Sequence, residues 1–162
     1  MKTLLKTTAV AAALVFAPAA MAQDMGWYGD VGLGLIKADL GVDLDFTTVQ
    51  GHLGYDINDN FGIEGELAIG VDGDLGVDLD HQAGVYGVLS TANTDGFEFF
   101  GRLGYGIAEV SGGGTSVDSD GFAYGVGGKY YFDGVNGMRL DLTQFDGDAD
   151  ATLISLGYAR KF

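Results

Sequence analysis

The stretch FGIEGELAIGV, residues 61–71, alternates between two kinds of side chain. Large apolar groups occupy one set of positions and small or charged groups the other: Phe61, Ile63, Leu67, Ile69 and Val71 against Gly62, Glu64, Glu66, Ala68 and Gly70. Successive side chains of a β-strand point to opposite faces of the sheet. The stretch therefore predicts a strand with one apolar face and one small or charged face.

The same two-residue period recurs in seven other segments, near residues 26–36, 46–56, 79–90, 97–109, 121–132, 138–146 and 151–162. In the segment near 79–90, Leu79 shares the apolar face with Val85 and Leu89. Turn-forming residues separate several segments, in DINDN (56–60), TANTDG (91–96) and DGVNG (133–137). Together they predict an all-β fold, an eight-stranded antiparallel up-and-down barrel whose closure removes sheet edges.

The first residues, MKTLLKTTAVAAALVFAPAAMA, place Lys2 and Lys6 before an apolar run and end on Ala20-Met21-Ala22. This order is typical of a secretory signal peptide. The apolar run is far shorter than the roughly 20 residues that a transmembrane helix needs. We predict a signal peptide at residues 1–22 and one barrel domain at residues 23–162.

The predicted mature chain is strongly acidic. It holds all 23 acidic residues but only six basic ones, which gives a formal charge of 6 − 23 = −17. Such a charge disfavours nucleic acid as a partner, because that binding depends on basic contacts to phosphate. The chain has no cysteine for a disulfide. Its 29 glycines lack a Gly-X-Y period and its aromatic content is 12%, which excludes collagen and plain disorder.

Alternation alone does not show which face of the sheet lies inside the barrel. The interior of an eight-stranded barrel has little room beyond its own side chains, and the apolar rows, with about a dozen aromatic residues, would overfill it. We therefore expect the opposite rows inside, where charged groups persist only when they are paired. These rows supply four acids and four bases for an interior ion-pair network: Glu64, Glu66, Glu98 and Asp141 with Arg102, Lys129, Arg139 and Lys161.

With its apolar faces outward, the barrel needs lipid around it. A transmembrane barrel carries aromatic girdles at both membrane interfaces. Candidate girdle residues lie near one end of their strands at Trp27, Tyr55, Phe61, Phe97, Phe132 and Phe162, and nearer the other end at Tyr105, Phe122 and Tyr124. A soluble barrel with a solvated charged face has the same period, and it stays open as an alternative.

A family resemblance is carried by two internal segments and the C-terminus: LGYDINDNFGIEGEL (53–67), GRLGYGI (101–107) and SLGYARKF (155–162). These segments resemble parts of the opacity-like, porin-family small outer-membrane barrels of Gram-negative bacteria. The first is similar to the family's second strand, periplasmic turn and third strand. The second is similar to its fifth strand, and the third to its C-terminal assembly signal. Gly157, Tyr158 and the terminal Phe162 fit the assembly signal. Arg160 departs from it, because an apolar or aromatic residue is expected there, although this side chain can snorkel to the headgroups.

The resemblance implies an outer-membrane location with both termini in the periplasm. It also implies insertion by the barrel assembly machinery, contact with outer-membrane lipid and lipopolysaccharide, and a monomeric state. The remaining four connections, about 37–45, 72–78, 111–120 and 147–150, would then face outward. They are short and strongly acidic.

Catalysis is not expected from this sequence. An outer-membrane enzyme acting on lipid A would need a histidine and a serine with an acid at the outer rim, within hydrogen-bond reach of one another. The two histidines are His52, in mid-strand on the interior face, and His81, near the outer end of its strand; neither has a serine in its local pattern.

The word LGVDLD occurs twice, at residues 40–45 and 75–80. Without a bulge, Asp43 and Asp45 share parity with an apolar row, whereas Asp78 and Asp80 share parity with an interior row, because a shift of one residue exchanges the faces. Both copies are expected at the outer rim. Carboxylates there could bind calcium or magnesium weakly, and the candidate ligands are Asp43, Asp45, Asp72, Asp74, Asp78 and Asp80. No cofactor is otherwise expected.

The favoured interpretation is a non-enzymatic outer-membrane barrel with a structural or surface-interaction role, plugged by its interior ion pairs. Two alternatives stay open. The first is a narrow diffusion channel that opens when the interior pairs rearrange. The second is a soluble periplasmic ligand-binding barrel.

Overall fold

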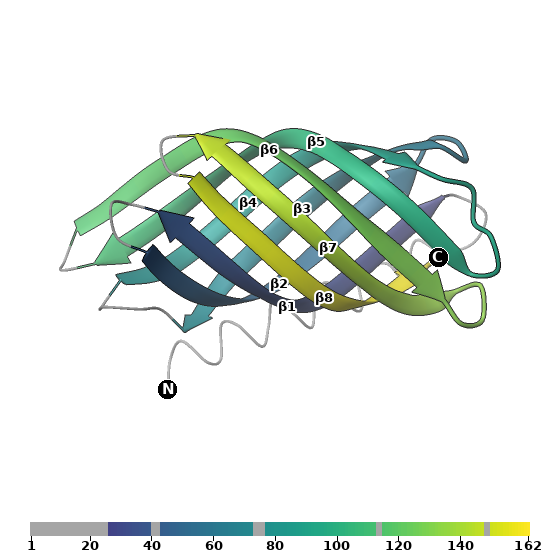
Figure 1. Cartoon of the computed structure of the whole chain (residues 1–162), viewed down its shortest axis with the longest axis horizontal. Coiled ribbons are helices and arrows are strands. Elements are labelled where there is room, and N and C mark those ends of the chain that lie inside the picture. The colour runs from purple at the N-terminus through teal and green to yellow at the C-terminus, as the bar shows by residue number, and fades with distance from the viewer. Residues whose placement is uncertain (1–25, 40–42, 73–76, 113–114, 148–149) are drawn as a thin grey trace.

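The computed structural model describes residues 26–39, 43–72, 77–112, 115–147 and 150–162, so the predicted signal peptide lies outside the described part of the chain. Eight strands follow one another: β1 (Trp27–Asp39), β2 (Asp43–Asp56), β3 (Phe61–Asp72), β4 (Val77–Ser90), β5 (Phe97–Gly112), β6 (Thr115–Tyr131), β7 (Asn136–Gly147) and β8 (Asp150–Lys161). Each pairs antiparallel with its neighbours, and β1 closes the barrel on β8 (Figure 1). Among these residues, none forms a helix long and apolar enough to cross a membrane.

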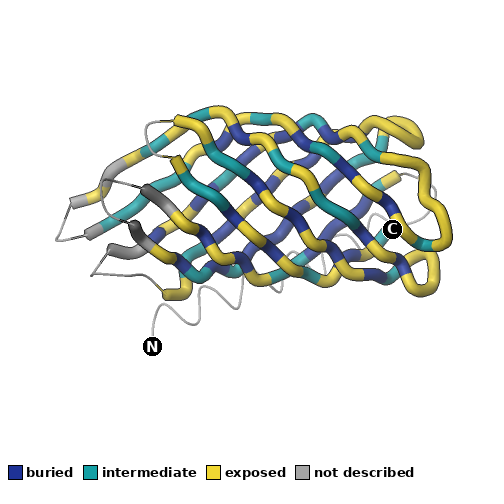
Figure 2. Tube along the Cα trace, viewed as in Figure 1, coloured by how far each residue is buried: buried dark blue, intermediate teal, exposed yellow. Residues whose placement is uncertain are grey.

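The predicted up-and-down barrel is therefore confirmed, and so is the face that lies inside. Along β3, Glu64 and Glu66 are each 2% exposed, whereas Ile63 is 50% exposed and Leu67 is 49% exposed. Figure 2 shows buried positions alternating with exposed or partly exposed ones along the middle of the strands that face the viewer. The apolar rows face outward, as expected of a barrel that lipid surrounds.

Three tight turns join the strands at the end of the barrel that also holds the C-terminus, here called the turn end (Figure 1). Asn58 Oδ1 accepts the backbone N–H groups of Asn60 and Phe61, each at 2.9 Å. In the last turn, hydrogen bonds from the Asn136 side chain and backbone hold the pKa of Asp133 below its usual value. Gly96 (φ 87°) and Gly134 (φ 81°) adopt left-handed conformations that favour glycine.

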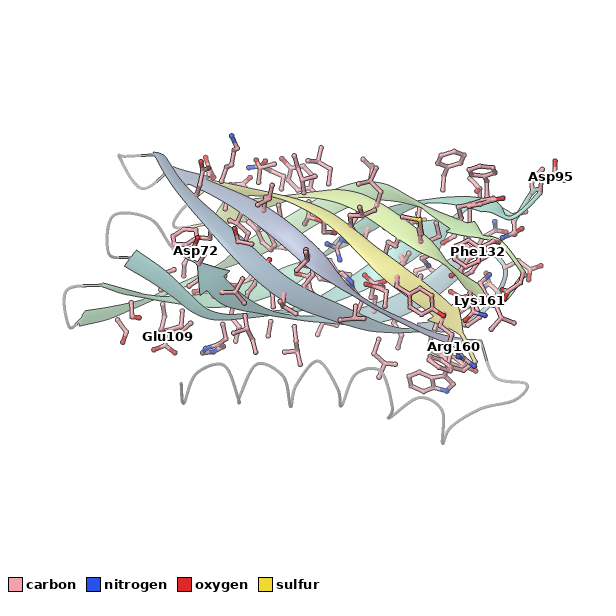
Figure 3. All side chains as sticks on the ribbon, turned by 90° about the horizontal axis from the view of Figure 1, so that it is seen from below. Asp72, Asp95, Glu109, Phe132, Arg160 and Lys161 are labelled. Atoms are coloured by element: carbon pink, nitrogen blue, oxygen red, sulfur yellow. The ribbon has the colours of Figure 1, made fainter. Side chains whose placement is uncertain are left out.

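The opposite end of the barrel, here called the rim end, is built from longer strands than the sequence predicts. The expected connections at 37–45 and 111–120 are largely strand, because β1 continues to Asp39, β2 begins at Asp43, and β6 begins at Thr115. These extensions are polar, so no apolar alternation marks them. Figure 3 places Asp72 and Glu109 at the rim end, and Asp95, Phe132, Arg160 and Lys161 at the turn end.

A register shift in β4 corrects the prediction for the second LGVDLD word. The ladder between β4 and β5 pairs Leu79 with Val110 and His81 with Glu109, so Asp80 is an extra residue in a bulge. Leu79 is 6% exposed and packs inside the barrel, whereas Asp80 is exposed. The predicted outward Leu79 and inward Asp80 are both wrong, and Asp80 is now exposed like Asp45 of the first copy.

Single-cysteine labelling tests this bulge cleanly, because the chain contains no cysteine. We expect a membrane-impermeant maleimide to modify the Asp80→Cys variant rapidly and the Leu79→Cys variant slowly in detergent-folded protein. Gln82→Cys, at a position buried in either register, serves as the protected control. Fast labelling of Leu79→Cys together with protection of Asp80→Cys would instead support a β4 register without the bulge.

Candidate functional site: the closed lumen

Arg102 of β5 lies at the centre of the lumen and is 3% exposed. Its Nη1 lies 3.0 Å from Glu64 Oε1 and 2.7 Å from Glu66 Oε2 on β3, two strands away on one side. Its Nη2 lies 3.1 Å from Asp141 Oδ1, and its Nε donates to Thr143 Oγ1 at 3.0 Å, both on β7. One guanidinium thus joins two opposite walls of the barrel.

Arg139 of β7 makes a second crossing and shares two of the same carboxylates. Its Nη1 lies 2.6 Å from Glu64 Oε2 and 3.0 Å from Asp30 Oδ2, and its Nε lies 3.0 Å from Asp141 Oδ2. Charge-assisted bonds from a planar guanidinium to carboxylates are among the strong hydrogen bonds of proteins. The two arginines and their carboxylates therefore form one network rather than separate pairs.

His52 of β2 lies between two carboxylates on the neighbouring strands. Asp30 and Glu66 are its register partners on β1 and β3. The ring Nδ1 lies 2.6 Å from Asp30 Oδ1, and Nε2 lies 2.8 Å from Glu66 Oε2. An ionised carboxylate only accepts hydrogen bonds, whereas a neutral imidazole carries one N–H. Both contacts are satisfied together when His52 is an imidazolium.

A separate group of ion pairs, centred on Glu98, lies nearer the turn end of the lumen. Lys129 Nζ of β6 lies 3.2 Å from Glu98 Oε1, and Lys161 Nζ of β8 lies 3.1 Å from Glu98 Oε2. The Lys129 and Glu98 side chains are almost fully buried, whereas the Lys161 side chain is 32% exposed. Lys161 therefore lies where the network meets the opening at the turn end.

The structure brings together all eight predicted network residues and adds two that the sequence argument left out, Asp30 and His52. Its ion pairs contain five acids, Asp30, Glu64, Glu66, Glu98 and Asp141, and, besides His52, four bases, Arg102, Lys129, Arg139 and Lys161. A charged His52 makes the count five against five. Charge balance and hydrogen-bond geometry thus lead independently to the same protonation state.

Three buried cations, Arg102, Lys129 and Arg139, also lie over aromatic rings, and each ring lies over a glycine of the next strand. The rings of Tyr28, Tyr86 and Phe100 lie opposite Gly54, Gly104 and Gly127 in the ladder. A Cβ on Gly54 would lie 2.1 Å from the Tyr28 ring. The three cation–ring pairs are Lys129 over Tyr28 at 3.7 Å, Arg102 over Tyr86 at 4.4 Å and Arg139 over Phe100 at 4.5 Å.

Neutral donors add hydrogen bonds to the same carboxylates. Tyr28 donates to Glu64 Oε2 at 2.9 Å, and Gln82 Nε2 donates to Glu66 Oε1 at 2.7 Å. Ser155 donates to Asp141 Oδ2 at 2.7 Å. A buried polar network is stable only when its members are satisfied, and here the central carboxylates reach that state.

An apolar layer lies inside the barrel between this network and the rim end. Its buried members are Ile36, Phe46, Leu79 and Leu153, with Ala108, Val110, Phe145 and Ala151 packed against them. The sequence argument treated the interior as polar and missed this layer. The parity of Ile36, Phe46 and Leu153 was a usable signal, because each falls on an inward row near a strand end.

The predicted cation ligands at the rim do not converge in the described part of the chain. Asp45, Asp72 and Asp80 are exposed. Asp74 and the side chains of Asp43 and Asp78 lie outside what the structure describes. Among the described residues, no group of three or more acidic, histidine or cysteine side chains has the arrangement of a metal site.

The predicted girdle residues form aromatic contacts on the outer surface. At the turn end, Trp27 packs on Tyr55 with ring centroids 5.2 Å apart, and Phe97 packs on Tyr130 at 4.4 Å. Tyr105 and Phe122 meet edge to face at 5.6 Å, about midway along the long strands β5 and β6. The remaining predicted members are outward too: Phe61, Tyr124 and Phe132 are each at least 40% exposed.

The C-terminal segment closes the barrel. Phe162 donates its backbone N–H to Trp27 O at 2.9 Å, and Gly157 and Tyr158 pair with Gly32 and Val31 of β1. Arg160 is exposed and lies 6.0 Å from the Phe162 ring. Gly157 and Tyr158 therefore lie on β8, the strand that completes the sheet, and Phe162 directly follows it.

The chain belongs to the family described as outer membrane protein beta-barrel domain, whose profile matches residues 7–162. It is accordingly a barrel of the Gram-negative outer membrane. This assignment and the outward apolar rows exclude the soluble periplasmic carrier that the sequence left open. Among curated proteins, none matches the sequence significantly.

Solved outer-membrane barrels share the fold at low sequence identity. Ail, the attachment invasion locus protein of Yersinia pestis, solved with the heparin analogue sucrose octasulfate, is 18% identical with a TM-score of 0.65, over 86% of this chain and 100% of Ail. Neisserial surface protein A is 17% identical with a TM-score of 0.63, over 86% and 100%. OprG of Pseudomonas aeruginosa is 14% identical with a TM-score of 0.66, over 87% and 98%.

Replacing a glycine beneath a stacked ring should destabilise the barrel. A Gly54→Val side chain would collide with the Tyr28 ring, and overpacking of this kind costs about 1–3 kcal/mol. We expect a lower urea midpoint for unfolding in detergent than for the wild type. Gly65→Val is the matched control, because a Cβ there meets only Leu53 O at 3.9 Å on the outer surface. Equal midpoints for the two variants would argue against the ring-over-glycine arrangement.

Removing one arginine should have a large cost. An Arg139→Ala change leaves Asp30, Glu64 and Asp141 with unbalanced buried charge, and breaking a buried pair costs about 3–5 kcal/mol. The exposed Arg160→Ala change should leave stability within about 0.5 kcal/mol of wild type. Both are measured by equilibrium unfolding. Similar stabilities for the two variants would show that the network does not hold the barrel together.

Proposed function

We propose that this protein is a closed, non-enzymatic outer-membrane barrel with a structural or surface-interaction role. The observation that carries the proposal is the double crossing of the lumen by Arg102 and Arg139, whose carboxylate partners lie on opposite walls. Permeation would have to separate buried opposite charges. Each separation leaves an uncompensated charge in a site of low dielectric, which is costly.

A second barrier supports the closed state. The apolar layer of Ile36, Phe46, Leu79 and Leu153 lies in series with the ionic network, on its rim side. Narrow hydrophobic constrictions block ion passage because water leaves them. An ion that displaced the salt bridges would still meet this layer, so loss of the ionic network alone should not create a pore.

The environment of both histidines supports a non-enzymatic role. The two ring nitrogens of His52 each contact a carboxylate, so neither is available to activate a hydroxyl group. His81 lies on the outer surface, 3.6 Å from Glu109. A base for acyl transfer would instead face a nucleophile at one of its ring nitrogens.

The rim end is the surface that would meet the cell's surroundings if the termini and the turn end are periplasmic. Its described part exposes seven aspartates: Asp45, Asp72, Asp80, Asp118, Asp120, Asp146 and Asp150. A surface of this charge favours cationic partners, including divalent ions that bridge to lipopolysaccharide phosphates. A polyanion such as the heparin analogue seen with Ail does not suit it.

A narrow channel is the second candidate. Two buried polar atoms, Thr48 Oγ1 and Gln50 Oε1, have no hydrogen-bond partner within the described protein, and both lie between the ionic network and the apolar layer. Buried polar atoms of this kind are commonly satisfied by water. Water at that level would extend a polar path through most of the lumen and leave the apolar layer as the remaining barrier.

Planar-bilayer recording separates the two candidates. We expect no single-channel steps from the wild type, none from Arg102→Ala, and steps only when Arg102→Ala is combined with Phe46→Ser, which weakens both barriers. Phe122→Ser, on the outer face, is the matched control for the second change. Heat-modifiable gel mobility verifies that each variant is folded.

The opposite pattern would favour the channel. Reproducible steps from the wild type that change in size with Arg102→Ala would show that the ion pairs gate a conducting path. Silence of the double variant, in a folded protein, would mean that a further barrier closes the lumen.

A further inference from the structure

The outer wall of the barrel contains an apolar groove with two glycines in its floor. Outward-facing Gly101 of β5 and Gly128 of β6 leave space where other positions carry side chains. The groove has a volume of about 810 Å³. Its walls are six side chains that are each at least 45% exposed: Leu89, Phe99, Val126, Leu140, Leu142 and Ile154.

The ladder registers show that the groove crosses the strands in one continuous line. Five lining residues form a single row from β4 to β8: Leu89, Gly101, Val126, Leu142 and Ile154. A second row beside it contains Thr91, Phe99, Gly128 and Leu140. The groove therefore spans five strands rather than being a set of separate gaps.

The groove also rises from the turn end towards mid-membrane. Leu89 is one position from Ser90, the last residue of β4, whereas Ile154 is seven positions from Lys161, the last residue of β8. Four inter-strand spacings of about 4.8 Å make it about 19 Å long. At a strand tilt of about 40° it climbs about 12 Å, close to half of the roughly 30 Å hydrocarbon thickness.

The low end of the groove is polar. Thr91 lines it and is exposed, and its Oγ1 accepts the Phe99 N–H at 3.0 Å, which leaves the hydroxyl hydrogen free to donate outward. Asn93 is exposed in the same turn, and its Oδ1 accepts the Gly96 N–H, which leaves its amide N–H groups as donors. An acceptor group such as a phosphodiester suits this end.

We propose that this groove binds one acyl chain of a phospholipid from the leaflet at the turn end, with the phosphodiester headgroup at Thr91 and Asn93. The groove's polar end, apolar length and rise to the bilayer centre match one such lipid. A second barrel is a poorer occupant, because its convex wall cannot enter a concave groove. The assignment to the periplasmic leaflet rests on the proposed orientation of the barrel.

Native mass spectrometry of the detergent-folded protein with added phosphatidylethanolamine tests the site. We expect the wild type to retain one phospholipid, and the Gly101→Leu/Gly128→Leu variant to lose it because leucine fills the groove. The matched control, Gly65→Leu/Gly87→Leu, fills outward glycines outside the groove and should retain the lipid. Equal retention by both variants would overturn the site. Retention of lipid A in preference to phosphatidylethanolamine would overturn the choice of leaflet. It would not bear on the proposal that the lumen is closed, which the conductance recordings test separately.

A conservative reporter keeps the test valid if the double variant fails to fold. The chain has one tryptophan, Trp27, so Phe99→Trp in a Trp27→Phe background places a single fluorophore on the groove wall. In vesicles containing acyl-brominated phosphatidylcholine, we expect stronger quenching there than for Ile63→Trp in the same background. Both positions face outward, and repeating the measurement with bromines at a shallow and at a deep position of the acyl chain separates lipid contact from depth. Equal quenching at the two positions would contradict an acyl chain held in the groove.

Discussion

Arg102 and Arg139 are 3% and 1% exposed inside the barrel, so the charges of their guanidinium groups must be matched by protein groups. This constraint organises the lumen. It accounts for the carboxylates of Glu64 and Asp141, each of which contacts both arginines. It also accounts for the rings beneath the cations and for the glycines beneath the rings, because a planar ring fits flat against the wall only where the next strand lacks a side chain.

The same constraint divides the molecule into an ionic interior and an apolar exterior, the reverse of a soluble domain. Because every strand pairs on both sides, the backbone needs no solvent within the membrane. Glycine serves both surfaces: inside it makes room for Tyr28, Tyr86 and Phe100, and outside Gly101 and Gly128 form the floor of the groove. The high glycine content is thus a packing requirement of a narrow barrel.

Much of the fold and of the lumen was predictable from the alternation of apolar and polar residues, because odd and even positions of a strand point to opposite faces. All eight strands and the inward placement of the network residues follow from it. Leu79 and Asp80 were misplaced because a bulge inserts one residue without leaving a sign in the composition. The extensions of β1, β2 and β6 at the rim end were missed because they contain few large apolar residues. His52 was placed on the correct face, but its contacts with Asp30 and Glu66 depend on cross-strand register, which the sequence alone does not provide.

The central claim is that the lumen is a charge-balanced core, and His52 supplies the fifth positive charge. The chain has two histidines, so ¹⁵N-histidine NMR of a His81→Gln variant in detergent micelles observes His52 alone. At neutral pH we predict that Nδ1 and Nε2 each show a bonded proton that exchanges slowly with water. A neutral ring with one unprotonated nitrogen, or rapid proton exchange at both nitrogens, would contradict the account.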